Sequence, residues 1–166
     1  MLGAQYAQPP QYGYPQPPVS WVPCNGNAIP PNAIQAGREA DGKPLFVARA
    51  SINGGVHIGK ACQAWRTGAN ISFGGREVAM VGYEVLVGNP AAVRWVPQHS
   101  YVTPQRIPGM LVQGGHEPDG QPLFVARATY MGGVHPGKAG THLKGAHIAY
   151  GGEEFHLLDY EVLVLV

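Results

Sequence analysis

The hydrophobic positions of this chain fall in short runs separated by turn-forming residues. Apolar residues that favour β-strands occupy positions 45–47 and again 123–125. An Asp-Gly pair precedes each run and a Gly-Gly pair follows it. Because both pairs favour tight turns, the pattern predicts a strand between two turns. No window repeats apolar residues with the 3.6 period of an amphipathic helix, so we expect little or no helix.

Further runs of the same kind extend the prediction along the chain. Residues 71–73 and 148–150 are each followed by another Gly-Gly pair. The sequence Tyr-Glu-Val-Leu-Val occupies 83–87 and 160–164, and its β-branched residues are typical of a buried strand. We therefore predict an all-β fold of short antiparallel strands joined by tight Gly and Pro turns.

The recurrence is a duplication of a long unit. Residues 37–60 are matched by residues 115–138, and Trp-Val-Pro opens both copies at positions 21 and 95. We therefore divide the chain into a tail (1–19), a first repeat (20–88) and a second repeat (89–166). Each repeat is too short to bury its apolar face alone, so the repeats should pack about a pseudo-twofold axis, with pairs of strands exchanged between them.

The segment between the opening Trp-Val-Pro and the glutamate is longer in the second repeat than in the first. Trp95 and Glu117 lie four residues further apart than Trp21 and Glu39, which places an insertion in the loop around residues 101–109. The two candidate binding faces need not be identical.

Composition excludes several classes of partner. The 166 residues have a net charge of +1, and 13% are charged against 45% hydrophobic. Nucleic acid and anionic membranes attract a basic surface, which this chain lacks. Membrane insertion is not expected, because no apolar run reaches about 18 residues. The first residues have no basic start and no apolar run, so we expect a cytoplasmic protein, with any release by a non-classical route.

The two cysteines and the first residues carry little information on function. Cys24 and Cys62 have no counterparts in the second repeat, so we expect reduced thiols without a zinc site. Residues 5–18 are rich in Pro, Tyr, Gln and Gly, which predicts a solvated tail or a docking segment for a partner.

A glutamate and a lysine bracket the duplicated run in each repeat, and we expect both on glycine-flanked loops outside the strands. Lys60 follows Glu39 by 21 residues, and Lys138 follows Glu117 by the same interval. A carboxylate accepts two hydrogen bonds and an ammonium donates up to three, so the pair matches the vicinal hydroxyls of a sugar. The alternative is that both pairs are surface ion pairs with no further role.

Other polar residues of the repeats have simpler interpretations. Arg49 and Arg127 lie within the apolar runs, and we expect them to pair with Glu84 and Glu161 in the terminal strands. These pairs should support the scaffold.

The histidines near the lysines are candidates for secondary ligand contacts only. His57 and His135 precede the lysines by three residues, and we expect both on loops. The chain shows no cluster of metal-ligand spacing, no nucleophile–base pair and no opposed carboxylates. We therefore expect no metal, no cofactor and no enzymatic activity.

The repeated motifs are similar to those of a known family, the DM-nine repeat proteins, which include mannose-binding lectins of invertebrates. The similarity extends from Trp21 to Val166. It rests on residues 26–34, 45–50, 136–138 and 140–148, and on both Tyr-Glu-Val-Leu-Val endings.

The resemblance implies an all-β protein of two repeats that forms homodimers and binds one mannose-type sugar per repeat. The family's lysine corresponds to Lys60 and Lys138. Its acidic residue, an aspartate in the lectins, corresponds to Glu39 and Glu117, whose extra methylene moves the carboxylate outward.

Two functions follow as hypotheses. The first is a metal-independent lectin for mannose-type glycans, acting in innate pattern recognition and agglutination. The alternative is a non-catalytic intracellular interaction module, associated with vesicles in stress or infection, that uses the Pro/Tyr tail. Deletion of the residues before Val19 discriminates between them, because a lectin would keep its sugar binding.

Overall fold

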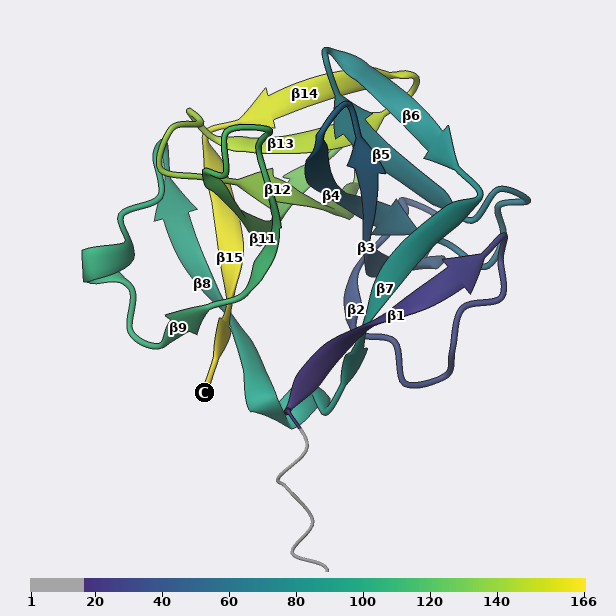
Figure 1. Cartoon of the computed structure of the whole chain (residues 1–166), viewed down its shortest axis with the longest axis horizontal. Coiled ribbons are helices and arrows are strands. Elements are labelled where there is room, and N and C mark those ends of the chain that lie inside the picture. Colours follow the sequence, from purple (N-terminus) through teal and green to yellow (C-terminus); the bar gives the residue numbers. More distant parts are fainter. Residues whose placement is uncertain (1–16) are drawn as a thin grey trace, which may run out of the picture.

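Fifteen β-strands and two short 3-10 helices make up the part of the chain that the computed structural model describes, residues 17–166 (Figure 1). The first repeat contains β1 (Val19–Asn25), β2 (Gln35–Arg38), β3 (Pro44–Ile52), β4 (Gly55–Ala61), β5 (Ala69–Phe73), β6 (Arg76–Met80) and β7 (Gly82–Gly88). The 3-10 helix η1 (Pro90–Ala92) joins it to the second repeat. The second repeat contains β8 (Val93–His99), η2 (Pro104–Arg106), β9 (Met110–Leu111), β10 (Gln113–His116), β11 (Pro122–Tyr130), β12 (Gly133–Ala139), β13 (Ala146–Tyr150), β14 (Glu153–Leu157) and β15 (Asp159–Leu165).

The predicted all-β fold with little helix is therefore confirmed. All but the last residues of the predicted tail lie outside the described residues. Within residues 17–166, no helix has the length and apolar character needed to cross a membrane.

The order of the strands shows the predicted pseudo-twofold symmetry. The hydrogen-bonded path runs β1-β7-β3-β2-β12-β13-β14-β6-β5-β4-β10-β11-β15-β8. When each strand is replaced by its counterpart in the other repeat, the same path is obtained in reverse. The symmetry axis therefore passes between β14 and β6, in the middle of the path.

The two repeats exchange strand pairings, as expected for units too small to close their own sheets. β2 of the first repeat pairs with β12 of the second, and β10 pairs with β4. A third pairing joins β14 to β6 through Glu153 and Arg76. Figure 1 shows β12, β13 and β14 lying beside β4, β5 and β6 in the upper part of the molecule.

Two glycines permit this close approach. A Cβ atom on Gly37 would lie 1.9 Å from the carbonyl oxygen of Val134, and one on Gly115 would lie 1.9 Å from that of Val56. Both distances are far below van der Waals contact, so a side chain at either position would push the repeats apart.

The core has one part in each repeat and a third part shared between them. The shared part joins Val47, Ile58 and Leu86 to Val125 and Leu163, all fully buried. Burying each such side chain contributes about 1.5–3 kcal/mol. Much of the stabilising apolar contact of either repeat is therefore made with the other one.

The predicted insertion also has a structural counterpart. Residues 100–112 connect β8 to β10 and contain η2 and β9, whereas residues 26–34 make the shorter connection between β1 and β2. β9 pairs with β15 at the end of the sheet. The extra residues lie over the second repeat only.

Candidate functional site

The first candidate lysine lies on a strand, and the prediction of a loop position is wrong. Lys60 is in β4, only 2% exposed, because the strand is packed between neighbours from both repeats. Its Nζ lies 3.6 Å from Oε1 of Glu39, so the predicted ion pair of the first repeat is present. Burial lowers the pKa of Lys60, and the charge of Glu39 opposes this effect.

A histidine of the second repeat completes this contact. Nδ1 of His135, in β12, lies 3.0 Å from Nζ of Lys60. Nε2 of the same ring lies 3.1 Å from the carbonyl oxygen of Tyr130. An ammonium can only donate, so Nδ1 accepts from Lys60 and Nε2–H donates to Tyr130. The expectation that His57 and His135 occupy loops is also wrong, since both are buried on strands.

The electrostatics keep this histidine neutral. Burial lowers the pKa of His135, and the neighbouring charge of Lys60 lowers it further. The ring therefore serves as a fixed acceptor that orients the lysine toward Glu39.

An open pocket of about 600 Å³ surrounds the Glu39–Lys60 pair. Its walls come from both repeats and include Glu39, Lys60, Trp65, Asn70, Glu77 and Tyr150. Nζ of Lys60 lies 5.5 Å from the ring centroids of Trp65 and of Tyr150. The pocket thus combines carboxylates, an ammonium and an amide with two aromatic rings, and we refer to it as the Lys60 pocket.

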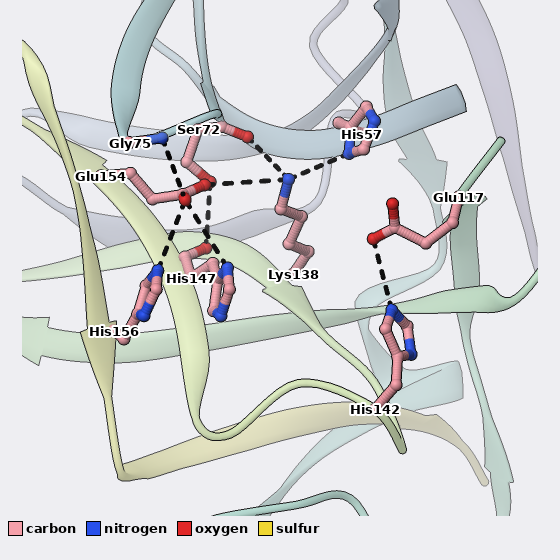
Figure 2. A network of polar contacts seen from close by, with 9 residues as sticks. All are labelled: His57, Ser72, Gly75, Glu117, Lys138, His142, His147, Glu154 and His156. Atoms are coloured by element: carbon pink, nitrogen blue, oxygen red, sulfur yellow. Dashed lines mark hydrogen bonds and ion pairs between the residues drawn. The ribbon is translucent and has the colours of Figure 1, made fainter. Parts of the chain in front are cut away.

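The second candidate lysine has different neighbours (Figure 2). Nζ of Lys138, in β12, lies 2.9 Å from Nδ1 of His57 and donates to the Ser72 carbonyl oxygen at 2.8 Å. Its ion-pair partner is Glu154, at 3.8 Å, and not the predicted Glu117. Burial lowers the pKa of Lys138 as it does that of Lys60.

Glu117 is paired elsewhere. Its Oε1 lies 3.3 Å from Nε2 of His142 (Figure 2). His142 comes from the turn between β12 and β13, where the equivalent residue of the first repeat is Ala64. The Glu–Lys contact of the first repeat is therefore replaced in the second by two separate contacts, Glu117 with His142 and Glu154 with Lys138.

A cluster of polar residues on the β13–β14 hairpin is not among the sites predicted from the sequence. His147 and His156 face each other across the hairpin, with ring centroids 3.7 Å apart and planes inclined by 10°. Both rings approach Oε1 of Glu154 (Figure 2). The sequence does contain a signal for this cluster. A two-residue turn at Gly151 and Gly152 places positions 147 and 156 directly opposite each other on the two strands.

Burial shapes the ionisation of this cluster. Burial, and then the neighbouring ring of His156, lower the pKa of His147 from 6.5 to about 4. Burial by itself would raise the pKa of Glu154, but the charges of Lys138 and its other neighbours outweigh burial and lower it. The carboxylate is therefore ionised at neutral pH.

The predicted arginine pairs support the scaffold. Nε of Arg49 lies 3.0 Å from Glu84, and Nε of Arg127 lies 2.9 Å from Glu161, which confirms both predictions. Each guanidinium also donates to a backbone carbonyl of the other repeat, at Gly114 and Ala36 respectively. These side chains hold the two repeats together.

The repeated fold and its two lysine sites define a tandem-repeat protein of DM-nine type. A sequence model of the DM9 repeat matches residues 13–80 and 61–157, and the chain belongs to the DM9 repeat family. A comparison with curated proteins finds no match.

A solved structure has a similar fold. The nematode sperm cell motility protein MFP2B is 16% identical, with a TM-score of 0.62, over 96% of this chain and 50% of that protein. The chain thus spans about half the length of that protein. At this level of identity, the similarity shows the fold alone.

Proposed function

We propose that this protein is a carbohydrate-binding module, a lectin for mannose-type glycans, with one sugar site per repeat and no catalytic activity. The observation that supports the proposal is the buried Lys60, which meets Glu39 at the base of an open pocket with aromatic walls. Membership of the DM9 repeat family is consistent with it.

The chemistry of the Lys60 pocket suits a sugar with adjacent hydroxyl groups. Such hydroxyls both donate and accept, so one donates to the Glu39 carboxylate while its neighbour accepts from the Lys60 ammonium. Asn70 adds an amide that can do either. Trp65 and Tyr150 offer apolar faces for the C–H bonds of the sugar ring. The pocket needs no metal to present these groups.

The two sites should differ in strength. Among the described residues, Lys60 makes one hydrogen bond, to His135, and its other N–H groups can serve Glu39 and a ligand. Lys138 makes two, to His57 and to Ser72, so fewer of its donors remain. We infer that the Lys60 pocket is the stronger sugar site.

Individual affinities should be weak, on the order of 1 mM, as is usual for shallow polar sites. Homodimerisation would link several sites and raise the avidity for a branched glycan. Light scattering of the purified chain measures the oligomeric state directly.

The first test is a glycan array probed with the whole chain, with and without a chelator. We expect signals on terminal mannose in both conditions. The variant with Glu39, Lys60, Glu117 and Lys138 all replaced by Ala should lose retention on mannan beads, whereas Lys144→Ala, at an exposed lysine, should keep it. Equal retention of the quadruple variant and the wild type would refute the proposed sites.

A further inference from the structure

Three side chains of the second repeat converge on one point of the β13–β14 hairpin. Nδ1 of His147 lies 3.7 Å and Nε2 of His156 lies 3.4 Å from Oε1 of Glu154. All three atoms lie within 4.8 Å of one another. Figure 2 shows both ring nitrogens directed at the same carboxylate oxygen.

We propose that His147, Glu154 and His156 bind a first-row transition metal ion, Zn²⁺, in a site that the first repeat lacks. Two imidazole nitrogens and one carboxylate oxygen form a ligand set that suits Zn²⁺, whereas Ca²⁺ and Mg²⁺ prefer oxygen ligands alone. Ligands that bind Zn²⁺ at about 2.0–2.2 Å lie somewhat closer together than these atoms do, so a small contraction would complete the site.

A second observation points to a ligand at the same place. The Glu154 side chain is only 7% exposed, yet its Oε2 atom has no hydrogen-bond donor among the described residues. A buried carboxylate oxygen without a donor is costly, and its nearest cation, Lys138, stands 3.8 Å away. A metal ion held by both oxygens of this carboxylate would give Oε2 the close partner that it lacks.

The first repeat provides the comparison. The positions that correspond to His147 and His156 are Asn70 and Ala79, while Glu154 corresponds to Glu77. The glutamate thus occurs in both repeats, and the two histidines occur only in the second. The metal site is therefore separate from the Lys60 pocket, but it shares Glu154 with the surroundings of Lys138, the lysine of the second candidate sugar site.

Binding requires a limited rearrangement. A metal ion lies in the plane of each imidazole that binds it, so the stacked rings of His147 and His156 must open. The His156 side chain is 53% exposed and has room to turn. The remaining coordination position would face solvent on the same side and hold water. The ion would link β13 to β14.

The test uses the full-length chain without a histidine tag, freed of metal by a chelator and then dialysed. Zn²⁺ is titrated by calorimetry, and Co²⁺ is titrated by its visible absorption, which reports tetrahedral coordination. The test variant is His147→Asn/His156→Ala, which gives the second repeat the residues of the first. The controls are His99→Ala and His142→Ala, which remove histidines outside the proposed site.

We expect the wild type and both controls to bind one equivalent of Zn²⁺, and the test variant to bind at least about tenfold more weakly. Zn²⁺ should raise the melting temperature of the wild type but not that of the test variant. Equal Zn²⁺ affinity of the test variant and the wild type would overturn the proposal, as would a wild type with no stoichiometric binding. The variant's mannan binding, measured in parallel, separates a failure here from a failure of the proposed function.

Discussion

At the scale of single residues, duplicated side chains have acquired different partners. Lys60 pairs with the glutamate that precedes it in its own repeat, whereas Lys138 pairs with Glu154, a residue of the following hairpin. Both lysines also contact a histidine of the opposite repeat. Each lysine–histidine contact lies between the repeats, so these residues serve both the candidate sites and the fold.

His57 gives a prediction about pH. Burial, and then the charge of Lys138, lower the pKa of His57 from 6.5 to about 4. The other titratable groups that act on it are Glu117, Glu154 and His116. Because the folded pKa is the lower one, the unfolded chain binds the proton first as the pH falls. The contribution to stability is complete above pH 6.5 and is lost between pH 6.5 and about 4.

The measurement is denaturant unfolding at several pH values. The wild type should lose on the order of 1–3 kcal/mol more stability than His57→Gln across this range. His99→Gln, at an exposed histidine, serves as the control and should follow the wild type. If His57→Gln showed the full pH dependence of the wild type, His57 would not be the group responsible.

At the scale of elements, the turns show how sequence determines the hairpins. The predicted Gly-Gly turn after β3 is centred one residue earlier, on Asn53 and Gly54, with φ of 48° and 85°. Positive φ at both positions suits a tight hairpin, and Asn-Gly is its preferred sequence. The second repeat makes the same turn with Met131 at φ 48°. Methionine has no preference for this conformation, so the turn after β11 is strained.

Exchange of the two turn residues tests this interpretation. Met131→Asn gives the second hairpin the turn of the first and should stabilise the protein by about 0.5–1 kcal/mol. The reciprocal change, Asn53→Met, should destabilise it by a similar amount. Thermal or urea unfolding measures both, and Met110→Asn, at another exposed methionine, controls for loss of surface apolar area. Destabilisation by Met131→Asn would contradict the explanation.

At the scale of the whole molecule, the two repeats form a single folding unit. The exchanged pairings β2–β12 and β10–β4, the shared core and the Arg49 and Arg127 contacts all cross between the repeats. The Lys60 pocket is also built from both repeats, since Tyr150 in its wall belongs to the second repeat. Neither repeat alone contains all the residues of the Lys60 pocket.

Separated repeats should therefore fail to fold. Residues 1–88 and residues 89–166, produced alone, would each expose their half of the shared core and leave a buried lysine without its histidine. We expect poorly dispersed amide NMR spectra for each fragment, and a dispersed spectrum when the two are mixed. A native-like spectrum of either fragment alone would show that the repeats fold independently.

The fold could be predicted from the sequence because the signals for it are local. The glycine-containing pairs mark the turns to within one residue, and the duplication implies the symmetry. The contacts of the candidate sites depend on neighbours that are distant in the sequence. Nothing local to Lys60 indicates His135, and the choice of Glu154 over Glu117 by Lys138 depends on how β14 packs. The glycine-rich surroundings of His57 and His135 resemble turns and so predict loops, whereas these glycines permit close packing of strands.

The central claim is that the Lys60 pocket, built from both repeats, binds a mannose-type sugar. The most direct measurement is an NMR titration of the full chain with methyl α-mannoside, for the wild type and for Lys60→Met, Tyr150→Ala and Lys144→Met. The account predicts saturable shifts for the wild type and for Lys144→Met, and an affinity at least about tenfold weaker for Lys60→Met and for Tyr150→Ala. Undiminished binding by Lys60→Met in a folded protein would contradict it.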